Sequence, residues 1–347
     1  MSDKAVATFG EIMLRLAPPN MLMIGQATSF DAIYGGGEAN VAISLACFGH
    51  HAIYVSCIPE NLVGDACIRS LNKWGVDTSH VQRSGSRLGI YFLEIGAVQR
   101  PSRVIYDRAG SAISEVKPGS IDWKNIFAEC DWFHITGITP AISASAAEVS
   151  LEAMKAAREA GCTISIDLNF RKKLWKYGKT PADVMPGLVE LADIAVGNEE
   201  DADKVFGIKA PEADVDAGKV EAEGYRYVAT KLCERFANLK KVAITLRGSI
   251  SASHNTWSGI LYDKKTDAMH VATQYDITHI VDRVGGGDSF AAGLIHSLRT
   301  GASDADAIAF AVAASCLKHS IVGDSNLVTV DMVENVMKSG GSGRVQR

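Results

Sequence analysis

The sequence lacks several features that would assign it to a common class of protein. Its seven cysteines are odd in number, widely spread and without a C-x-x-C pair, so neither a disulfide framework nor a zinc site is expected. We interpret them as small buried residues. No apolar run approaches the roughly 18 to 20 residues that span a bilayer, and Met1–Lys4 lead into no secretory signal. We therefore expect a cytoplasmic protein with no membrane partner.

The charge balance offers no strong field of either sign. Asp and Glu number 40 against 35 Lys and Arg, the formal net charge is -5, and no dense basic tract carries interleaved aromatic residues. A nucleic acid partner is therefore not expected. The 47% hydrophobic content suffices for a large buried core.

Common phosphate-binding motifs are also absent. The chain contains no Walker A pattern and neither the H-R-D nor the D-F-G motif of protein kinases. A dinucleotide-binding site is the nearest rival, because Gly35–Gly37 precede a helical pattern and Glu60 follows the next expected strand. The third glycine of that fingerprint is replaced by Asn40, however, which weakens this alternative.

What is present is a regular alternation of short apolar runs and helical patterns. The sequence predicts strands at 132–136, 163–167, 194–196 and 241–246, and helices at 145–160, 181–192, 286–300, 304–319 and 329–338. This order favours parallel βαβ units with helices on both faces of a sheet. We expect a single three-layer α/β/α domain over residues 1–338.

Four segments fall outside this alternation. Residues 12–34 are interpreted as exposed strands, and together with two more strands within 87–108 they could form a second, smaller sheet, a candidate lid. Its edges would favour a homo-oligomer. Residues 209–224 are polar and acid-rich and are interpreted as a surface insertion, and residues 339–347 as a mobile tail.

The most informative motif is the glycine triplet Gly285, Gly286 and Gly287 with Asp288, which stands directly before a helical apolar pattern. Glycines at a helix start let backbone N–H groups converge, and the helix dipole adds partial positive charge there. Such a site can hold a phosphoryl group while Asp288 accepts the proton of an attacking hydroxyl. The alternative is that the motif is purely structural, a glycine-rich turn with an acidic residue that caps the helix.

A second glycine-rich segment, Gly35, Gly36 and Gly37 followed by Asn40, is a candidate binding site for a hydroxyl-rich ligand. The segments 35–42 and 285–293 together resemble the first and second signatures of the ribokinase-like (PfkB) carbohydrate kinases. The resemblance covers nearly the whole chain. It implies a ribokinase-like fold, ATP and Mg²⁺ as cofactors, and a sugar substrate, and it leaves open whether a monovalent cation is needed.

Within this family the sequence is most similar to kinases of 2-keto-3-deoxygluconate, through residues 89–92, 106–112 and 167–175. The resemblance implies ATP-dependent phosphorylation of that sugar acid at O6. It also implies that four side chains contact the substrate, namely Tyr91, Tyr106, Arg108 and Arg171. Arginine suits this role because its planar fork binds a carboxylate, although both arginines are also consistent with structural ion pairs, and both tyrosines with packing. Glu11 is suggested as an acceptor for a substrate hydroxyl.

The resemblance also implies a nucleotide and metal region. Thr245, Arg247, Gly248 and Ser249 match a nucleotide-contacting loop, with Arg247 where many relatives have glycine. The N-x-x-E element linked to magnesium appears as Asn198 to Asp201, one methylene shorter, and contact with the metal through water is expected, with simple helix capping as the alternative. The acid that leads the second signature, Asp282, is followed by Arg283, which departs from the family pattern. His134 is interpreted as structural.

Two further functions remain open from the sequence. One is another sugar kinase of this family, acting on ribose, fructose or a related sugar. The other is a sugar-binding sensor without catalysis, although the intact Asp288 and glycine triplet argue against it.

Overall fold

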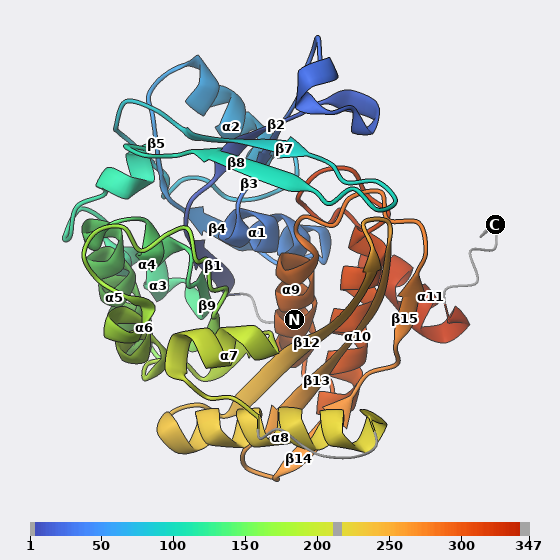
Figure 1. Cartoon of the computed structure of the whole chain (residues 1–347). Helices are drawn as coiled ribbons and strands as arrows, with labels where there is room; N and C mark the ends of the chain where they lie inside the picture. The colour runs from blue at the N-terminus through green and yellow to red at the C-terminus, as the bar shows by residue number, and fades with distance from the viewer. Residues whose placement is uncertain (1–3, 211–216, 341–347) are drawn as a thin grey trace.

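The computed structural model describes residues 4–210 and 217–340 (Figure 1). Its strands are β1 (Ala5–Phe9), β2 (Met13–Ala17), β3 (Asp31–Gly35), β4 (Ala52–Val55), β5 (Cys57–Ile58), β6 (Gln82–Arg83), β7 (Gly89–Glu94), β8 (Arg103–Asp107), β9 (Cys130–Thr136), β10 (Thr163–Asp167), β11 (Ile194–Gly197), β12 (Lys241–Ser251), β13 (His254–Asp263), β14 (Ala268–Val271) and β15 (Tyr275–Ile277). Its α-helices are α1 (Gly37–Cys47), α2 (Leu62–Asn72), α3 (Trp123–Ala128), α4 (Thr139–Ile142), α5 (Ala144–Glu159), α6 (Pro181–Val189), α7 (Glu199–Phe206), α8 (Ala217–Arg235), α9 (Gly286–Arg299), α10 (Asp304–Lys318) and α11 (Val330–Ser339). Short 3₁₀ helices lie at Pro19–Met21, Ile24–Gln26 and Ala112–Glu115. Within the described ranges, no helix is long and apolar enough to span a bilayer.

The large central sheet has the order β14-β13-β12-β11-β10-β9-β1-β4, with β15 also paired to β13. Neighbouring strands from β12 to β4 are parallel, whereas β13 is antiparallel to β12, β14 and β15. The sheet is therefore mostly parallel, as predicted, with an antiparallel edge.

Helices cover both faces of this sheet. All five residues of β1 are buried, because helices cover both faces of this parallel strand. Such strands have nearly continuous apolar sequences. Ala5, Ala7 and Phe9 pack in one core with α3, α5, α6, α7 and α8. Val6 packs in the other core with α1, α2, α9, α10 and α11. The predicted three-layer α/β/α arrangement is confirmed.

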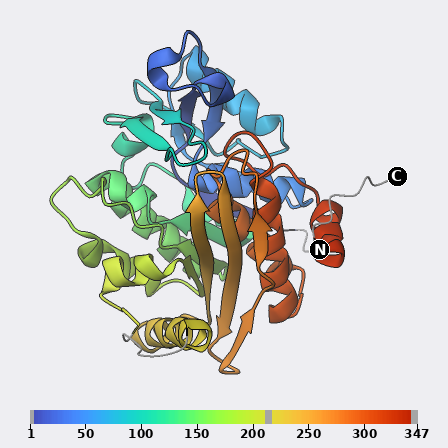
Figure 2. The same ribbon diagram turned by 45° about the vertical axis from the view of Figure 1, so that its right-hand side comes forward.

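The smaller sheet has the order β3-β2-β7-β8 and is mixed, since β2 is antiparallel to β3 and parallel to β7. Its strands lie within the predicted segments 12–34 and 87–108. It lies across one end of the large sheet (Figures 1 and 2). The prediction of exposed strands is wrong for β2, because Met13, Arg15 and Ala17 are buried against the rest of the molecule. Three expectations remain predictions: that this sheet closes as a lid, that residues 1–338 form a single domain, and that the protein self-associates.

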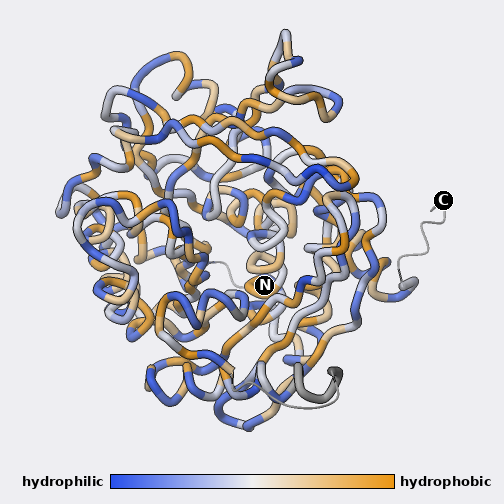
Figure 3. Tube along the Cα trace, viewed as in Figure 1, coloured by the Kyte–Doolittle hydropathy of each residue, from blue (hydrophilic) through white to orange (hydrophobic). Residues whose placement is uncertain are grey.

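Part of the segment predicted as a surface insertion, 209–224, is helical. Residues 217–224 form the first part of α8, whose later residues Val228, Ala229 and Leu232 are buried in the core. Figure 3 shows both hydrophobic and hydrophilic residues along the later turns of α8, as expected of a helix with one packed face. Residues 211–216, and most of the tail predicted as mobile, 341–347, lie outside the described residues.

All seven cysteines are free, as expected. Cys47 and Cys316 are only half-buried, so the expectation of buried cysteines fails for these two.

Candidate active site

A cleft of about 540 Å³ lies between the small sheet and the carboxyl ends of β10, β11 and β12. The glycine segments 35–37 and 285–287 form part of its wall. The predicted site residues that line it are Gly35, Gly36, Gly37, Asn40, Tyr91, Tyr106, Arg171, Asn198, Asp201, Thr245, Arg247, Gly285, Gly286, Gly287 and Asp288. The two signatures, far apart in the sequence, therefore face one space.

The start of α9 forms one end of this cleft. Gly285 precedes the helix with a φ of 83°, and a Cβ added there would lie 1.7 Å from the carbonyl oxygen of Asp324. Only glycine fits, because both the backbone conformation and the close approach exclude a side chain. The Gly286 N–H donates to the carbonyl oxygen of Arg283 at 3.3 Å, whereas the N–H groups of Gly287 and Asp288 have no partner within the helix and can receive an anion. The helix predicted from 286 is confirmed.

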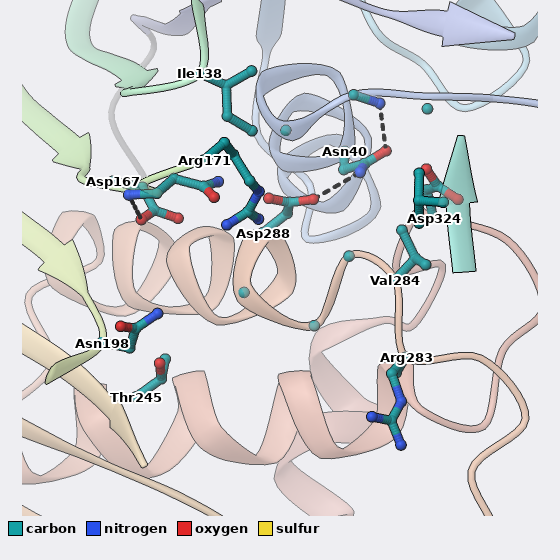
Figure 4. Close-up of a pocket in the computed structure, with 18 of the residues that line it drawn as sticks. Asn40, Ile138, Asp167, Arg171, Asn198, Thr245, Arg283, Val284, Asp288 and Asp324 are labelled. Carbon is teal, nitrogen blue, oxygen red and sulfur yellow. Dashed lines mark hydrogen bonds between the residues drawn. The ribbon is translucent and has the colours of Figure 1, made fainter. Parts of the chain in front are cut away.

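Asp288 lies in the first turn of α9 and meets the other glycine segment directly. The Asn40 Nδ2 group donates a hydrogen bond of 2.7 Å to its Oδ2 (Figure 4). Burial raises the pKa of Asp288 to about 6, an effect that the Asn40 hydrogen bond opposes. The carboxylate is therefore ionised near neutral pH yet basic enough to accept a proton.

Asp167 and Arg171 approach Asp288 from the end of β10. Burial raises the pKa of Asp167 well above its usual value, and the carboxylates of Asp201 and Asp288 add to this. The Arg171 side chain extends between Asp167 and Asp288 (Figure 4). Its guanidinium donates to the carbonyl oxygen of Phe170 at 3.1 Å and stays exposed to the cleft.

A smaller cavity of about 140 Å³ adjoins the cleft and shares Tyr106, Arg171 and the glycine segment with it. Its basic side chains are Arg108, Arg171, Lys172 and Lys173. Arg108 is held by an ion pair with the buried Glu11 and lies over the ring of Tyr106 at 5.4 Å. Ser111 Oγ donates to the other oxygen of Glu11 at 2.7 Å. The cavity concentrates positive charge beside the Asp288 cleft.

The predicted substrate contacts therefore have different surroundings. The hydroxyl of the buried Tyr91 donates to Asp324, while Tyr106 is 40% exposed. Both oxygens of Glu11 already accept from Arg108 and Ser111. Contact of these side chains with a substrate stays a prediction.

The residues predicted to contact the nucleotide differ in their position relative to the cleft, and their role stays a prediction. Thr245 and Arg247 line the cleft, but Gly248 and Ser249 are not among its lining residues and continue β12, paired with Thr256 and Asn255. The unusual Arg283 donates to the carbonyl oxygens of Ser251 and Ala252 at 3.1 and 2.6 Å, so it joins the glycine turn to the β12–β13 hairpin.

The N-x-x-E-like element forms a capping box. Asn198 Oδ1 accepts from the Asp201 N–H at 3.0 Å, and the Asp201 carboxylate accepts from the N–H groups of Asn198 and Phe170 at 3.0 and 2.9 Å. Burial raises the pKa of Asp201. No cluster of three or more ligating His, Cys, Asp or Glu side chains occurs in the part of the chain that is described. Carboxylates of Asp167, Glu200 and Asp288 line the cleft, an oxygen set that suits a hydrated Mg²⁺. The magnesium role of Asn198 and Asp201 stays a prediction.

Sequence reasoning missed Asp324 as a cleft residue. Its carboxylate accepts from Arg15 and Tyr91, and its backbone packs on Gly285. A polar break between two helical patterns, residues 323–326, was the available signal. Asn169, with a φ of 38°, also lines the cleft. His134 is fully buried beside Ser165, as a structural histidine would be.

Glycines at the start of α9, an aspartate of raised pKa in its first turn and an adjoining cavity with basic side chains are together the features of a phosphotransferase of the carbohydrate kinase type. The pfkB family carbohydrate kinase model matches residues 3–329, and the chain belongs to this family. It is 45% identical to a solved structure of 2-dehydro-3-deoxygluconokinase from Thermotoga maritima, with a TM-score of 0.91 and coverage of 96% of this chain and 99% of that one.

Two curated relatives also match over most of their length. A 2-dehydro-3-deoxygalactonokinase of Haloferax volcanii is 32% identical over 342 residues, 97% of this chain and 98% of that protein. A 2-dehydro-3-deoxygluconokinase of Bacillus subtilis is 29% identical over 318 residues, 91% of this chain and 90% of that protein.

Proposed function

We propose that this carbohydrate kinase phosphorylates 2-keto-3-deoxygluconate at O6 with ATP, giving 2-keto-3-deoxy-6-phosphogluconate and ADP. The observation that carries the proposal is the pairing of Asp288 at the start of α9 with an adjoining cavity lined by Arg108 and Arg171. The first suits proton removal from a hydroxyl, and the second suits a carboxylate.

The basic cavity supports an acid as substrate rather than a neutral sugar. Arg171 lines both the cleft and the cavity, and Arg108 is fixed by Glu11. A guanidinium that is already oriented loses little freedom when it binds a carboxylate through two parallel hydrogen bonds. An elongated sugar acid could thus place its carboxylate in the cavity and its terminal hydroxyl at Asp288.

The proposed reaction takes place at the Asp288 end of the cleft, away from the basic cavity. The O6 hydroxyl attacks the γ-phosphorus, its proton passes to Asp288, and ADP leaves. The N–H groups that follow Gly285 stabilise charge on the phosphoryl oxygens. Asn40 holds the Asp288 carboxylate by its 2.7 Å hydrogen bond.

ATP and Mg²⁺ are the proposed cofactors. The Mg²⁺ ion would offset phosphate charge, and the cleft carboxylates Asp167, Glu200 and Asp288 are oxygen donors that could hold its water shell. The chain's own contribution is this set of carboxyl groups beside the backbone N–H groups of the turn at Gly285–Gly287.

Replacement of the base tests the proposal. Asp288→Asn should lower kcat about 10²- to 10⁴-fold with little change in KM, because it keeps the shape and removes the basicity. Asp306→Asn is the matched control, since Asp306 is the third residue of α10 as Asp288 is of α9, but it is exposed and far from the cleft. A coupled ADP assay measures both variants, and near wild-type turnover by Asp288→Asn would refute this role.

The epimeric acid 2-keto-3-deoxygalactonate is the second candidate substrate, because the Haloferax volcanii relative is named for it. The higher identity to the Thermotoga maritima protein favours the gluconate form. Comparing kcat/KM for both acids, ribose and fructose decides the question. We expect the highest kcat/KM for 2-keto-3-deoxygluconate. A higher kcat/KM for 2-keto-3-deoxygalactonate would reassign the substrate. A higher kcat/KM for ribose or fructose would overturn the sugar-acid proposal.

A further inference from the structure

A cluster of charged side chains lies buried behind the glycine turn that begins α9. Arg15, Asp282, Lys318 and Asp324 are each at most 3% exposed. The Arg15 guanidinium bonds the carboxylates of Asp282 and Asp324 at 2.6 Å each. We call this set the buried charge cluster, and its positive and negative charges balance.

Lys318, at the end of α10, differs from Arg15 in what it contacts. Its Nζ donates to the backbone carbonyl oxygens of Asp282 at 3.3 Å and Ile321 at 3.0 Å. The residue is fully buried. Burial lowers the pKa of Lys318, and the nearby carboxylates of Asp282 and Asp324 oppose this, which favours the ammonium form.

The two carbonyls belong to the two segments that shape the turn. Asp282 leads into it, and its carboxylate accepts from the N–H groups of Val284 at 3.1 Å and Gly323 at 3.0 Å. Ile321 leads to Asp324, whose carbonyl lies against Gly285. The ammonium therefore fixes the distance between the two segments that set the orientation of the Gly285–Gly287 N–H groups.

A dehydrated cation held by backbone carbonyls is the chemistry by which proteins bind potassium ions. Here the cation is tethered to the chain. We propose that Lys318 is a positioning residue that supplies an internal monovalent cation to the phosphoryl-binding turn, so that the kinase needs no added K⁺.

A positive charge at this place has two effects on the reaction. It holds the turn in the arrangement that receives the phosphoryl oxygens, and it adds to their electrostatic stabilisation. It also favours the ionised form of Asp288, since the Lys318 charge lowers the pKa of that carboxyl.

Two variants that both remove the charge but differ in the volume they leave test the inference. Lys318→Met fills the site without charge, whereas Lys318→Ala leaves room for a small cation. Both should lower kcat by about 10²-fold. Ammonium or potassium chloride should restore the Ala variant several-fold relative to choline chloride at equal ionic strength, and the Met variant should not respond. If Lys318 only filled space, Met would keep its activity and Ala would not be rescued.

Further readouts separate this inference from the substrate proposal. Any sugar that the enzyme phosphorylates can serve, so failure on the sugar acid does not affect the test. If the Ala variant is inactive under all conditions, its melting temperature still reports the site, and it should rise with ammonium chloride but not with choline chloride. Lys241→Met, which removes a part-buried lysine paired with Asp263 and Asp304, is the control and should keep kcat. A wild-type enzyme that requires K⁺, or an Ala variant with no cation response in either assay, would overturn the inference.

Discussion

Asp288 combines features that are seldom found in a surface carboxylate. It begins a helix, which favours its charge, yet burial raises its pKa to about 6. The hydrogen bond from Asn40 fixes the oxygen that would receive the proton. The residue is thus both oriented and basic.

This pKa predicts an acid limb in the rate profile. Asp288 acts in its deprotonated form, so kcat/KM should be level above about pH 6 and fall about tenfold per pH unit below it. A pH–rate profile measures this. The Asp306→Asn control should keep the same limb. A profile that stays level down to about pH 4.5 would contradict the raised pKa.

Arg171 gives a test of carboxylate binding that leaves the fold intact. Its guanidinium is exposed, and it donates a hydrogen bond to the neighbouring carbonyl oxygen of Phe170. Arg171→Met should lower kcat/KM for the sugar acid by about 10- to 100-fold, the usual loss for a charged hydrogen bond. Replacing Arg108 is less clear, because Glu11 would stay buried without its partner.

The matched control is Lys155→Met, which removes an exposed cation on α5 away from the cleft. Steady-state kinetics with the sugar acid and with a neutral sugar compare the variants. Equal losses in Arg171→Met and Lys155→Met would argue against the carboxylate role.

At the scale of elements, the turn before α9 is the most constrained. Gly285→Ala places a Cβ in the left-handed region and 1.7 Å from the Asp324 carbonyl. Gly301→Ala, just after the same helix at a φ of 81°, meets nothing within 4 Å. Gly301→Ala should cost about 1 to 2 kcal/mol from backbone strain alone.

Gly285→Ala should cost at least about 2 kcal/mol more, from overlap, and should also lose activity. Urea unfolding and the kinase assay separate the two effects. Equal stabilities and activities for both variants would show that the close approach at Gly285 does not matter.

The elements show why some predictions succeeded. The β10 bounds and the start of α9 follow from apolar runs that end at polar or glycine residues, and the structure agrees. The surface position of 209–224 stays a prediction, and the residues of α8 that pack inward begin only near Val228, after a polar stretch. Buried β2 was missed because Arg15 reads as a solvent-exposed residue unless its partners are known.

At the scale of the whole molecule, the site could be predicted only in part. Gly35–Gly37 and Asp288 could be predicted because their backbone geometry and chemistry depend on a few adjacent residues, which form the signature motifs. Asp324 and Lys318 act through contacts between distant segments, with Asp324 lying 309 positions from Arg15. No local pattern reveals such a contact.

A histidine pair lies at the opposite end of α9 from the cleft. Arg299 donates to His50 Nδ1 at 2.7 Å, so His50 donates through Nε2 to His296 Nδ1 at 2.8 Å. This chain requires both rings to be neutral. Burial lowers the pKa of each histidine to about 4.

The pair predicts loss of stability in acid. Between the usual pKa of 6.5 and about 4, the unfolded chain binds more protons than the folded chain, so stability falls as pH falls. His296→Gln removes one such group and can still accept from His50. Between about pH 7 and pH 4.5, the free energy of unfolding of the wild type, measured in urea, should fall by about 2 kcal/mol more than that of this variant.

Buried carboxylates act with the opposite sign, since burial raises the pKa of Glu38 to about 7. Their effect is common to both proteins and cancels in the difference. A difference that stays constant with pH would contradict the neutral histidine pair.

The hydrogen bond between Asn40 and Asp288 has a consequence for synthesis. Its partners are 248 positions apart, so a ribosome releases one long before it makes the other. Through most of translation the nascent chain contains Asn40 and the first glycine segment but lacks Asp288, the proposed base for phosphoryl transfer. Turnover becomes possible only after Asp288, in the last fifth of the sequence, has been made and has folded onto the earlier part.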